Sequence, residues 1–348
     1  MKVSFIVPAY NVESYIEECI NSVLCQNLQG IDNVVSIEVI IVNDGSTDAT
    51  WEKILKFKND SRVIIINKEN EGVSIARNMG LAKAVGKWVF FLDGDDIVSP
   101  DLLKSTYRYL LDENDICFVE HYEWNTKNEP RVISNINNKA INLGLEDIEE
   151  FRQAIFNRDY YGKYDYHNLK LSTPCKFYRR QLIIDKKIEF PPGIKTGEDA
   201  IFNFEFIKFM KKGVYVPKKL YYHRIISSSV SHSFNPDVES DFFEFHNKLR
   251  ELISETTDPT EYMQAFADRC LWSLGFCFLL KYSYIQNLPR KTRKRDFDNY
   301  YNAMKDEIRL SNLRNFRPEK RILLTLIKYK MFTLANAMIL IRRRLESV

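Results

Sequence analysis

The chain has 348 residues, of which 45% are hydrophobic, so it is long enough for one large domain or two modest ones. Lys and Arg number 50 against 47 Asp and Glu, and the resulting charge of +3 argues against nucleic acid as a main partner. The six cysteines show no C-x-x-C spacing, which argues against a zinc site or a dense disulfide framework and favours a reducing compartment. The apolar run after Met1 is too short for a signal peptide, so we expect a cytoplasmic catalytic region.

Short apolar runs alternate with stretches of helical periodicity up to Pro100. The apolar runs predict buried strands at Val3–Val7, Ile37–Val42, Val63–Ile66 and Trp88–Leu92. Helices are predicted at Tyr15–Leu24, Ala49–Phe57, Val73–Val85 and Asp101–Leu111. Strands that alternate with helices in this way predict a parallel sheet with right-handed crossovers.

The rest of the chain changes character twice. A mixed, aromatic-rich region is predicted to hold strands at Ile116–His121, Val214–Val216 and Leu220–His223, with helices at Leu145–Asn157 and Glu198–Lys211. Long helical stretches then follow at Asp237–Thr256, Pro259–Tyr284, Lys291–Leu310 and Pro318–Leu345. We place a domain boundary near Asn235-Pro236.

Two acidic clusters follow predicted strands. Asn43-Asp44-Gly45-Ser46 follows the second strand, and Asp93-Gly94-Asp95-Asp96 follows the fourth. Carboxylates bunched at the tips of buried strands are costly unless something positive lies there. A divalent metal, a ribose and a base with N–H donors would together account for both clusters. Taken alone, each cluster is equally compatible with an ordinary turn or a helix cap.

Glycine-rich phosphate loops are absent from the sequence. No G-x-G-x-x-G turn follows the first strand and no G-x-x-x-x-G-K-[ST] is present, so phosphates would have to be held by metal and side chains. Asp93 and Asp95 are two residues apart, and in a strand-end or turn geometry both can point into one cleft. One can accept from a ribose hydroxyl while the other binds Mg²⁺ or Mn²⁺.

Four segments resemble, in order, the successive motifs of glycosyltransferase family 2. They are Phe5-Ile6-Val7-Pro8-Ala9-Tyr10-Asn11, Val42-Asn43-Asp44-Gly45-Ser46-Thr47-Asp48, Asn70-Glu71-Gly72-Val73-Ser74-Ile75-Ala76-Arg77-Asn78-Met79-Gly80 and Phe91-Leu92-Asp93-Gly94-Asp95-Asp96. The resemblance covers about the first two-thirds of the chain. It implies the GT-A fold, which is an α/β fold with a mainly parallel central sheet flanked by helices, together with inverting transfer from a nucleoside-diphosphate sugar.

The resemblance also implies roles for individual residues. It places the base and the ribose against Pro8, Ala9 and Tyr10. Asp44 would accept from the uracil ring N–H, and Arg77 would approach the diphosphate or support the aspartate loop. Asp93 would bond the ribose, and Asp95 would ligate Mn²⁺ or Mg²⁺. The plainer alternatives are a surface ion pair for Arg77 and a core position for Tyr10.

A second acidic pair follows a glycine turn at the start of a predicted helix. Inverting displacement needs a carboxylate that takes the proton of the acceptor hydroxyl. Glu198-Asp199 resembles the family's E-D motif, in which the second acid is the base. We therefore assign Asp199 as the base and Glu198 as its support or as an acceptor contact. The alternative is a helix N-terminus whose acids suit the macrodipole.

The segment Tyr221–His232 resembles the flexible part of the family that closes over the diphosphate. Arg224 has the geometry of a bidentate phosphate donor. His223 or His232 either completes the metal coordination or forms a structural hydrogen bond. The aromatic stretch Tyr160–His167 either stacks on acceptor sugars or packs at the base of its own loop.

The stretch Ile322–Ile341 is nearly apolar, but Lys328 and Lys330 interrupt it. Each lysine would cost roughly 2.5–3.5 kcal/mol at the centre of a bilayer, so this stretch should not span a membrane. Because Arg342-Arg343-Arg344 follows, the helix either lies on an anionic membrane surface or is buried in a bundle with a basic end.

The sequence as a whole predicts a metal-dependent inverting glycosyltransferase that uses a UDP-sugar and a saccharide or lipid-linked saccharide acceptor in surface polysaccharide synthesis. Residues 1–235 would form the catalytic domain, with a nucleotide-binding half (1–100) and an acceptor half (101–235), and 236–348 a helical region. The location would be cytoplasmic or peripheral at the inner face of the cell membrane. The alternatives are a metal-dependent nucleotidyltransferase, which would need a glycine-rich phosphate loop, and a non-catalytic sugar-nucleotide or glycan-binding module.

Overall fold

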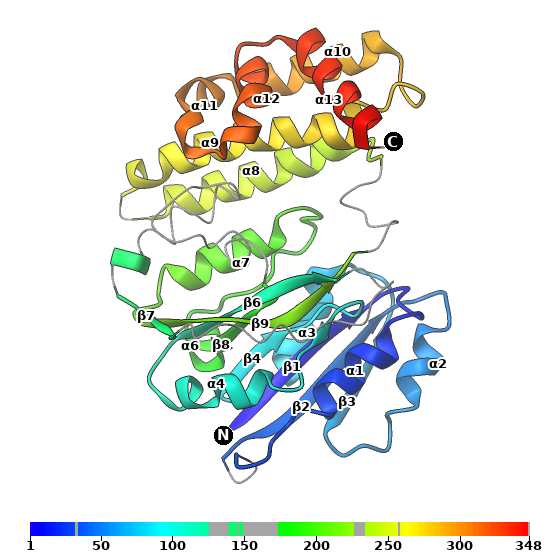
Figure 1. Ribbon diagram of the computed structural model, residues 1–348, viewed down its shortest axis with the longest axis vertical. Helices are drawn as coiled ribbons and strands as arrows, with labels where there is room; N and C mark the ends of the chain where they lie inside the picture. The colour runs from blue at the N-terminus through cyan, green and yellow to red at the C-terminus, as the bar shows by residue number, and fades with distance from the viewer. Residues whose placement is uncertain are drawn as a thin grey trace. The chain divides into compact units, whose positions relative to one another are not determined.

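The computed structural model of the chain describes residues 1–31, 34–124, 139–144, 146–148, 173–225, 234–256 and 258–346 (Figure 1). The chain divides into two compact units. The first comprises Met1–Arg152 and Asn168–Ile225, and the second comprises Gln153–His167 and Ile226–Val348. The domain boundaries expected from the sequence, at residues 100 and 235, stay predictions.

A single mixed sheet forms the centre of the first unit. Its described strands are β1 (Lys2–Ala9), β2 (Ser36–Asp44), β3 (Val63–Lys68), β4 (Trp88–Phe91), β5 (Ile97–Val98), β6 (Ile116–Trp124), β7 (Ile141–Leu143), β8 (Lys176–Arg179) and β9 (Gly213–Arg224). The order across the sheet is β3-β2-β1-β4-β8-β6-β9-β5, with β7 paired to β9. Figure 1 shows β1 to β4, coloured blue to cyan, as neighbours in this sheet.

The first four strands pair in parallel, as the sequence predicts. The side chains of β1, β2 and β4 are almost entirely buried, because both faces of the sheet are covered there, whereas β3 lies at the edge and is partly exposed. The helices that follow these strands are α1 (Ile16–Leu24), α2 (Thr50–Leu55), α3 (Val73–Lys83) and α4 (Leu102–Leu111). The predicted α/β architecture is therefore confirmed.

The other half of the sheet is less parallel than the sequence predicts. β8 pairs antiparallel with both β4 and β6, and β9 pairs parallel with β6 but antiparallel with β5 and β7. The two short strands predicted near residue 220 form one strand, β9, that continues through Pro217. The register with β6 shifts after Val119, next to this proline, because a proline cannot donate to the ladder.

Two helices of the first unit follow β8. They are α6 (Arg180–Asp185) and α7 (Glu198–Ile207). The prediction of a helix at the start of the Glu198 segment is confirmed, although the helix ends earlier than Lys211. The helix predicted at Leu145–Asn157 and the aromatic stretch Tyr160–His167 lie mostly or wholly outside the described residues, as does His232.

The described part of the second unit is helical. It contains α8 (Val238–Ser254), α9 (Thr260–Cys277), η2 (Phe278–Tyr282), α10 (Arg290–Ala303), α11 (Lys305–Leu310), η3 (Leu313–Asn315), α12 (Pro318–Lys328) and α13 (Phe332–Glu346). The stretches Lys291–Leu310 and Pro318–Leu345 are helical as predicted, but each is divided into two helices. The first is interrupted at Met304, and the second at Lys330, whose φ of 60° is left-handed and ends a right-handed helix.

Gly45 holds the turn that follows β2. Its φ is +69°, and a Cβ at this position would lie 2.5 Å from the backbone nitrogen of Asn70. Both the backbone conformation and the close approach therefore require glycine. Gly30 also has a positive φ, of +82°, but a Cβ there would meet nothing within 4 Å.

We expect Gly45→Ala to destabilise the first unit more than Gly30→Ala. The Gly30 variant carries only the left-handed strain of about 1–2 kcal/mol, whereas the Gly45 variant must also displace backbone at Asn70. Urea unfolding followed by circular dichroism measures both variants against the unchanged chain. Equal unfolding midpoints for the two variants would contradict this account of the turn.

Candidate active site

The loops after β1, β2 and β4 leave the sheet at the same edge, because these strands run in parallel. Ala9 at the end of β1 lies opposite Asn43 in β2, and Ile6 in β1 lies opposite Phe91 at the end of β4. The two acidic clusters that follow β2 and β4 are therefore neighbours at the carboxyl edge. This edge is where open α/β sheets bind their ligands.

Side-chain hydrogen bonds tie the loop after β1 to the loop after β2. Asn11 has a φ of 51° and accepts a hydrogen bond from the backbone N–H of Thr47 through Oδ1, at 2.8 Å. Its own backbone N–H donates to Oγ of Ser46, at 3.1 Å. The two loops are thus held as one surface before any ligand binds.

Of the three residues predicted to line the base and the ribose, Tyr10 is the most accessible. Its side chain is 49% exposed, whereas Ala9 is buried and Pro8 is of intermediate exposure. An exposed aromatic ring at this edge offers a flat face on which a base can stack. The contact of these residues with a nucleotide stays a prediction.

Asp44 is buried and already hydrogen-bonded within the protein. Its Oδ1 accepts from Nζ of Lys68 at 2.5 Å and from the backbone N–H of Glu71 at 3.0 Å. Its Oδ2 accepts from the backbone N–H of Gly72 at 2.9 Å, just before α3 begins. The carboxylate therefore fixes the start of α3, and the predicted bond to a uracil ring would use the lone pair of Oδ2 that remains.

A polar cavity of about 700 Å³ lies beside Asp44. It is lined by Asn43, Gly45, Ser46, Thr47, Asp48, Trp51, Glu52, Asn67, Lys68, Glu69 and Asn70. These residues come from the ends of β2 and β3, the loops that follow them and the start of α2, so several of them lie outside the four motif segments. No sequence pattern identified Trp51 or Asn67 as residues that line this cavity.

Arg77 in α3 binds three carboxylates at once. Its Nη2 donates to Asp93 at 3.0 Å, and its Nη1 donates to Glu198 at 3.1 Å and to Asp199 at 2.7 Å. Burial alone would lower the pKa of this guanidinium, but the charges of Asp199, Asp93 and Glu198 raise it above its usual range. The sequence left two roles open for Arg77, which were contact with the diphosphate and support of the aspartate loop. Its hydrogen bond to Asp93 fits support of that loop.

Two hydrogen bonds from Thr173 also hold the carboxylate of Asp199. Its Oδ1 accepts from Oγ1 of Thr173 at 3.0 Å, and its Oδ2 accepts from the backbone N–H of the same residue at 3.1 Å. Gly197, at φ +88°, turns the chain into α7 just before the acid pair. Burial and the negative charge of Asp199 raise the pKa of Glu198. The pair therefore lies at a helix start and also contacts the donor motif.

Asp96 is the buried anchor of the second acidic cluster. Its Oδ2 accepts from the hydroxyl of Tyr221 at 2.6 Å, and its Oδ1 accepts from the backbone N–H of Arg224 at 2.7 Å. Nδ1 of His223 lies 3.1 Å from Oδ2 of the same carboxylate. Asp96 thus braces the loop against the end of β9.

Asp95 contrasts with Asp96 because burial, rather than hydrogen bonding, dominates the surroundings of its carboxylate. Among the described residues it has no ion pair. Burial and the negative charges of Asp96 and Asp93 raise the pKa of Asp95 to about 7. Such an acid is stabilised when a cation arrives.

The described residues contain no cluster of three or more His, Cys, Asp or Glu side chains arranged for a metal ion. This finding excludes an all-protein cage there, but Mg²⁺ in particular is commonly held by one or two carboxylates, water and substrate phosphates. The hydrogen bond to Asp96 raises the pKa of His223 to about 9. Because a metal ligand must be neutral imidazole, cation binding by His223 would release a proton.

The side chain of Arg224 does not extend from the candidate active site toward solvent in this structure. Its side chain is buried, and the guanidinium lies between the rings of Tyr15 and Trp124, at 4.8 Å and 4.2 Å. Its Nε donates to the carbonyl oxygen of Asp95 at 2.8 Å, and its Nη2 donates to Glu18 at 2.7 Å. The predicted contact with diphosphate would require this guanidinium to leave Glu18, so that contact stays a prediction.

Several supporting residues were missed by the sequence analysis. Phe190 lies under the guanidinium of Arg77, with 5.1 Å between the Arg77 carbon and the ring centre, and stacks on Phe202. Asn78 holds the backbone of Phe190 through both a donated and an accepted hydrogen bond. No local pattern marks Phe190, and although Asn78 lies in the third motif segment, its role depends on this partner far away in the chain.

Comparisons with known proteins agree with this geometry. Residues 4–186 match the profile of the family described as Glycosyl transferase family 2. The glycosyltransferase GlyA of Streptococcus pneumoniae is 30% identical over 66% of this chain, but the chain spans only 31% of its length. EpsH of Bacillus subtilis is 30% identical over 73% of this chain and 72% of its own length.

A solved structure shares the fold over nearly the whole chain. Residues 1–349 of TarS from Staphylococcus aureus, crystallised with UDP-GlcNAc, superpose with a TM-score of 0.64 at 24% identity, covering 99% of this chain and 92% of that one. This likeness establishes the fold. Since the family profile covers more than half of the sequence, and EpsH is matched over more than two-thirds of its length, the chain belongs to glycosyl transferase family 2.

Proposed function

We propose that this chain is an inverting glycosyltransferase that moves a sugar from a UDP-sugar to a saccharide or lipid-linked saccharide acceptor, at the cytoplasmic face of the membrane. The observation that carries the proposal is the shared guanidinium of Arg77. It joins Asp93 of the donor motif to Asp199 of the acceptor motif, although 106 residues separate these two acids in the sequence. Donor and acceptor chemistry therefore meet at one edge of the sheet.

The relatives support a surface-polymer role. TarS is named a poly(ribitol-phosphate) beta-N-acetylglucosaminyltransferase, and its fragment was crystallised with UDP-GlcNAc. GgaB of Bacillus subtilis, 30% identical over 64% of this chain, is named a minor teichoic acid biosynthesis protein. By analogy the donor is a UDP-sugar and the acceptor is a growing surface polymer.

On the donor side, the exposed ring of Tyr10 stacks on the base and Asp93 accepts a hydrogen bond from the ribose. Asp95 fits a divalent cation, because it lies beside two other carboxylates whose negative charge raises its pKa. His223 is the second candidate ligand, since Asp96 holds Nδ1 and metal-bound histidines commonly have their other nitrogen fixed in this way. When bound, Mn²⁺ or Mg²⁺ would neutralise charge on the departing diphosphate.

On the acceptor side, Asp199 takes the proton of the attacking hydroxyl. The hydroxyl oxygen forms a bond to the anomeric carbon while the bond from that carbon to the diphosphate oxygen breaks, and the electron pair leaves with the diphosphate. Thr173 and Arg77 keep the carboxylate in one orientation. Glu198 supports this arrangement by sharing the guanidinium.

Arg224 acts as a positioning residue in this proposal. It holds the backbone of Asp95 through its Nε and receives support from Glu18 and two aromatic rings. The orientation of the metal-binding acid therefore depends on Arg224. A contact with the diphosphate would need a rearrangement of the end of β9.

The experiment that tests the proposal is a thermal-shift screen of nucleotide sugars with Mn²⁺, followed by measurement of nucleoside-diphosphate release and acceptor glycosylation. We expect a UDP-sugar to stabilise the chain and to be turned over. A chain that is stabilised by no nucleotide sugar, with or without Mn²⁺, would contradict the proposal.

Asp95→Asn should remove the Mn²⁺-dependent part of the thermal stabilisation by UDP and lower kcat by about a thousandfold. The loss follows from removing a cation that contributes several kcal/mol to charge stabilisation. Asp185→Asn is the matched control, because Asp185 is exposed on α6 and accepts only from Gln181 among the described residues. Near-normal turnover of the Asp95 variant at saturating Mn²⁺ would refute this assignment.

Asp199→Asn should lower kcat by about 10²–10⁴-fold while leaving the affinity for the UDP-sugar nearly unchanged, because a general base acts only in the chemical step. Glu198→Gln is the comparison, and we expect a smaller loss of kcat from it. Turnover and donor affinity are measured separately, by UDP release and by calorimetry. If Glu198→Gln abolishes turnover while Asp199→Asn spares it, the two roles must be exchanged.

Arg77→Ala should destabilise the first unit by about 3–5 kcal/mol, since it leaves three carboxylates without their cation in a buried site. Lys56→Ala is the control, because Lys56 makes an exposed ion pair with Glu17 and should cost less than about 1 kcal/mol. Urea unfolding measures both. A similar small effect from the two variants would show that the Arg77 cluster is not a structural requirement.

A further inference from the structure

Helix α13 has an apolar stripe on its solvent side. Leu334, Ala337, Met338 and Ile341 follow the spacing that places residues on one face of a helix. Leu334 is 52% exposed and Ile341 is 60% exposed. The residues that pack inward are instead Phe332, Ala335 and Ile339, which are buried. The helix therefore has a second apolar face that the second unit does not use for its own core.

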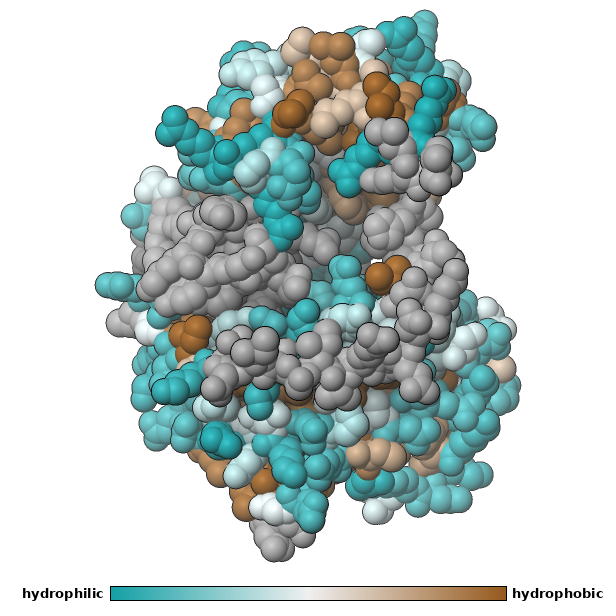
Figure 2. Space-filling model, in the orientation of Figure 1, coloured by the Kyte–Doolittle hydropathy of each residue, from teal (hydrophilic) through white to brown (hydrophobic). Residues whose placement is uncertain are grey.

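Helix α12 repeats this arrangement. Ile322, Leu326 and Tyr329 share one face, with Ile322 64% and Tyr329 67% exposed, while Leu324 and Ile327 are buried. The two helices pack against each other. Figure 2 shows apolar residues gathered at the top of the view, where Figure 1 draws α12 and α13. We call the two stripes, with the exposed Met331 between the helices, the hairpin face.

The segment that carries the hairpin face is strongly basic. Between residues 318 and 344 its cationic side chains are Lys320, Arg321, Lys328, Lys330, Arg342, Arg343 and Arg344. The acidic residues of α12 and α13 are Glu319 and Glu346. Asp298 in α10 pairs with Lys330, so a further acid faces the segment from a neighbouring helix. The balance of charge around the apolar stripes remains positive.

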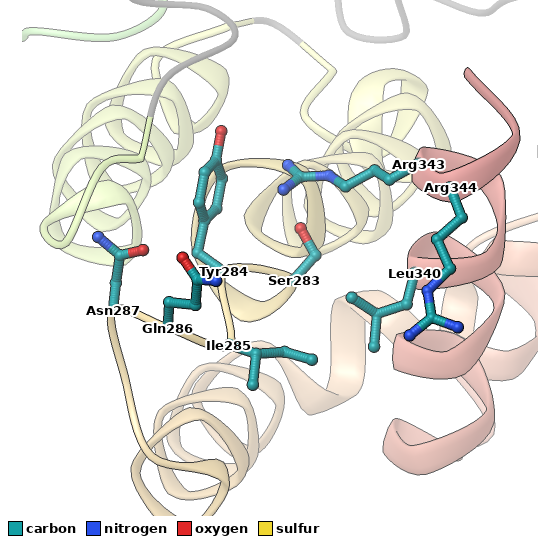
Figure 3. Close-up of a pocket in the computed structure, with 8 residues that line it drawn as sticks. All are labelled: Ser283, Tyr284, Ile285, Gln286, Asn287, Leu340, Arg343 and Arg344. Atoms are coloured by element: carbon teal, nitrogen blue, oxygen red, sulfur yellow. The ribbon is translucent and has the colours of Figure 1, made fainter. Parts of the chain in front are cut away.

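A cavity of about 360 Å³ lies beside the end of α13 (Figure 3). It is lined by Ser283, Tyr284, Ile285, Gln286, Asn287, Leu340, Arg343 and Arg344. Arg343 lies over the ring of Tyr284, at 4.2 Å, and Arg344 follows Ile341 by one helical turn. Guanidinium groups are suited to bidentate contact with phosphate. The cavity thus places phosphate-binding chemistry next to the apolar stripe.

We propose that the hairpin face docks the protein on a membrane surface of anionic phospholipid. Exposed aliphatic residues and Tyr329 enter the interface between headgroups and acyl chains, and the exposed Arg342 and Arg344 face the lipid phosphates. A second copy of this chain is a poorer occupant, because a two-fold contact would bring the same cations together. No helix in the described parts of the chain is long and apolar enough to cross a bilayer, so docking would be peripheral.

This inference deepens the proposed location at the membrane by naming the surface that docks, and it does not depend on the proposed sugar transfer. It also refines the two alternatives that the sequence left open for Ile322–Ile341. The stretch is not one helix, and each of its two helices packs one face in the second unit while exposing another. Bundle packing and surface binding are therefore compatible.

The test is co-sedimentation of the full chain with vesicles of phosphatidylcholine alone or with about one-third phosphatidylglycerol. We expect binding to the anionic vesicles, at least tenfold weaker binding to the neutral ones, and weakening by salt. The double variant Leu334→Ser with Ile341→Ser should lower binding at least tenfold, and so should Arg342→Gln with Arg344→Gln. The matched controls are Val85→Ser, an equally exposed apolar position in the first unit, and Arg295→Gln, an exposed arginine in α10.

Circular dichroism melting checks that each variant is folded, and UDP-sugar binding checks the first unit separately. The proposal is overturned if the unchanged chain does not bind anionic vesicles at low salt, or if the two double variants bind as tightly as the controls. It is also overturned if sedimentation without lipid shows a dimer that the Leu334 and Ile341 variant disperses while vesicle binding is absent.

Discussion

One buried cation holds the candidate active site together. Arg77 balances three carboxylates that would otherwise repel each other, and it joins segments more than 100 residues apart. Phe190 supports the guanidinium from below, and Asn78 fixes Phe190 from the same helix as Arg77. The position of the acceptor acids therefore follows from where α3 packs on the sheet.

The charges at this edge are balanced unevenly, and the imbalance indicates where a ligand would bind. Asp44, Asp96 and Asp199 have their oxygens engaged by internal donors, which fixes loops and helix starts. Asp95 differs from these acids, because burial and its acidic neighbours raise its pKa and the charge of His223 only partly offsets this rise. In the proposed function, Asp95 is therefore the acid that would hold the metal ion.

In the second unit, the uneven distribution concerns apolar surface instead of charge. Each of α12 and α13 buries one face, as an amphipathic helix must, and then presents further aliphatic residues to solvent among basic ones. The sequence-based choice between a buried helix and a membrane-surface helix assumed a single helix with a single apolar face. The left-handed turn at Lys330 removes that assumption, because it lets two shorter helices each have two apolar faces.

The sequence by itself determined the α/β order of the first hundred residues, the family and the set of acidic residues, since these depend on local periodicity and on motifs read along the chain. Only the tertiary structure decided that Arg77 binds Asp199 and that Arg224 is packed between Tyr15 and Trp124, because such pairings depend on how distant segments meet. Local sequence patterns likewise could not predict the half of the sheet in which parallel and antiparallel strands are mixed. Strand direction there depends on how segments far apart in the sequence meet, as β6 and β9 do.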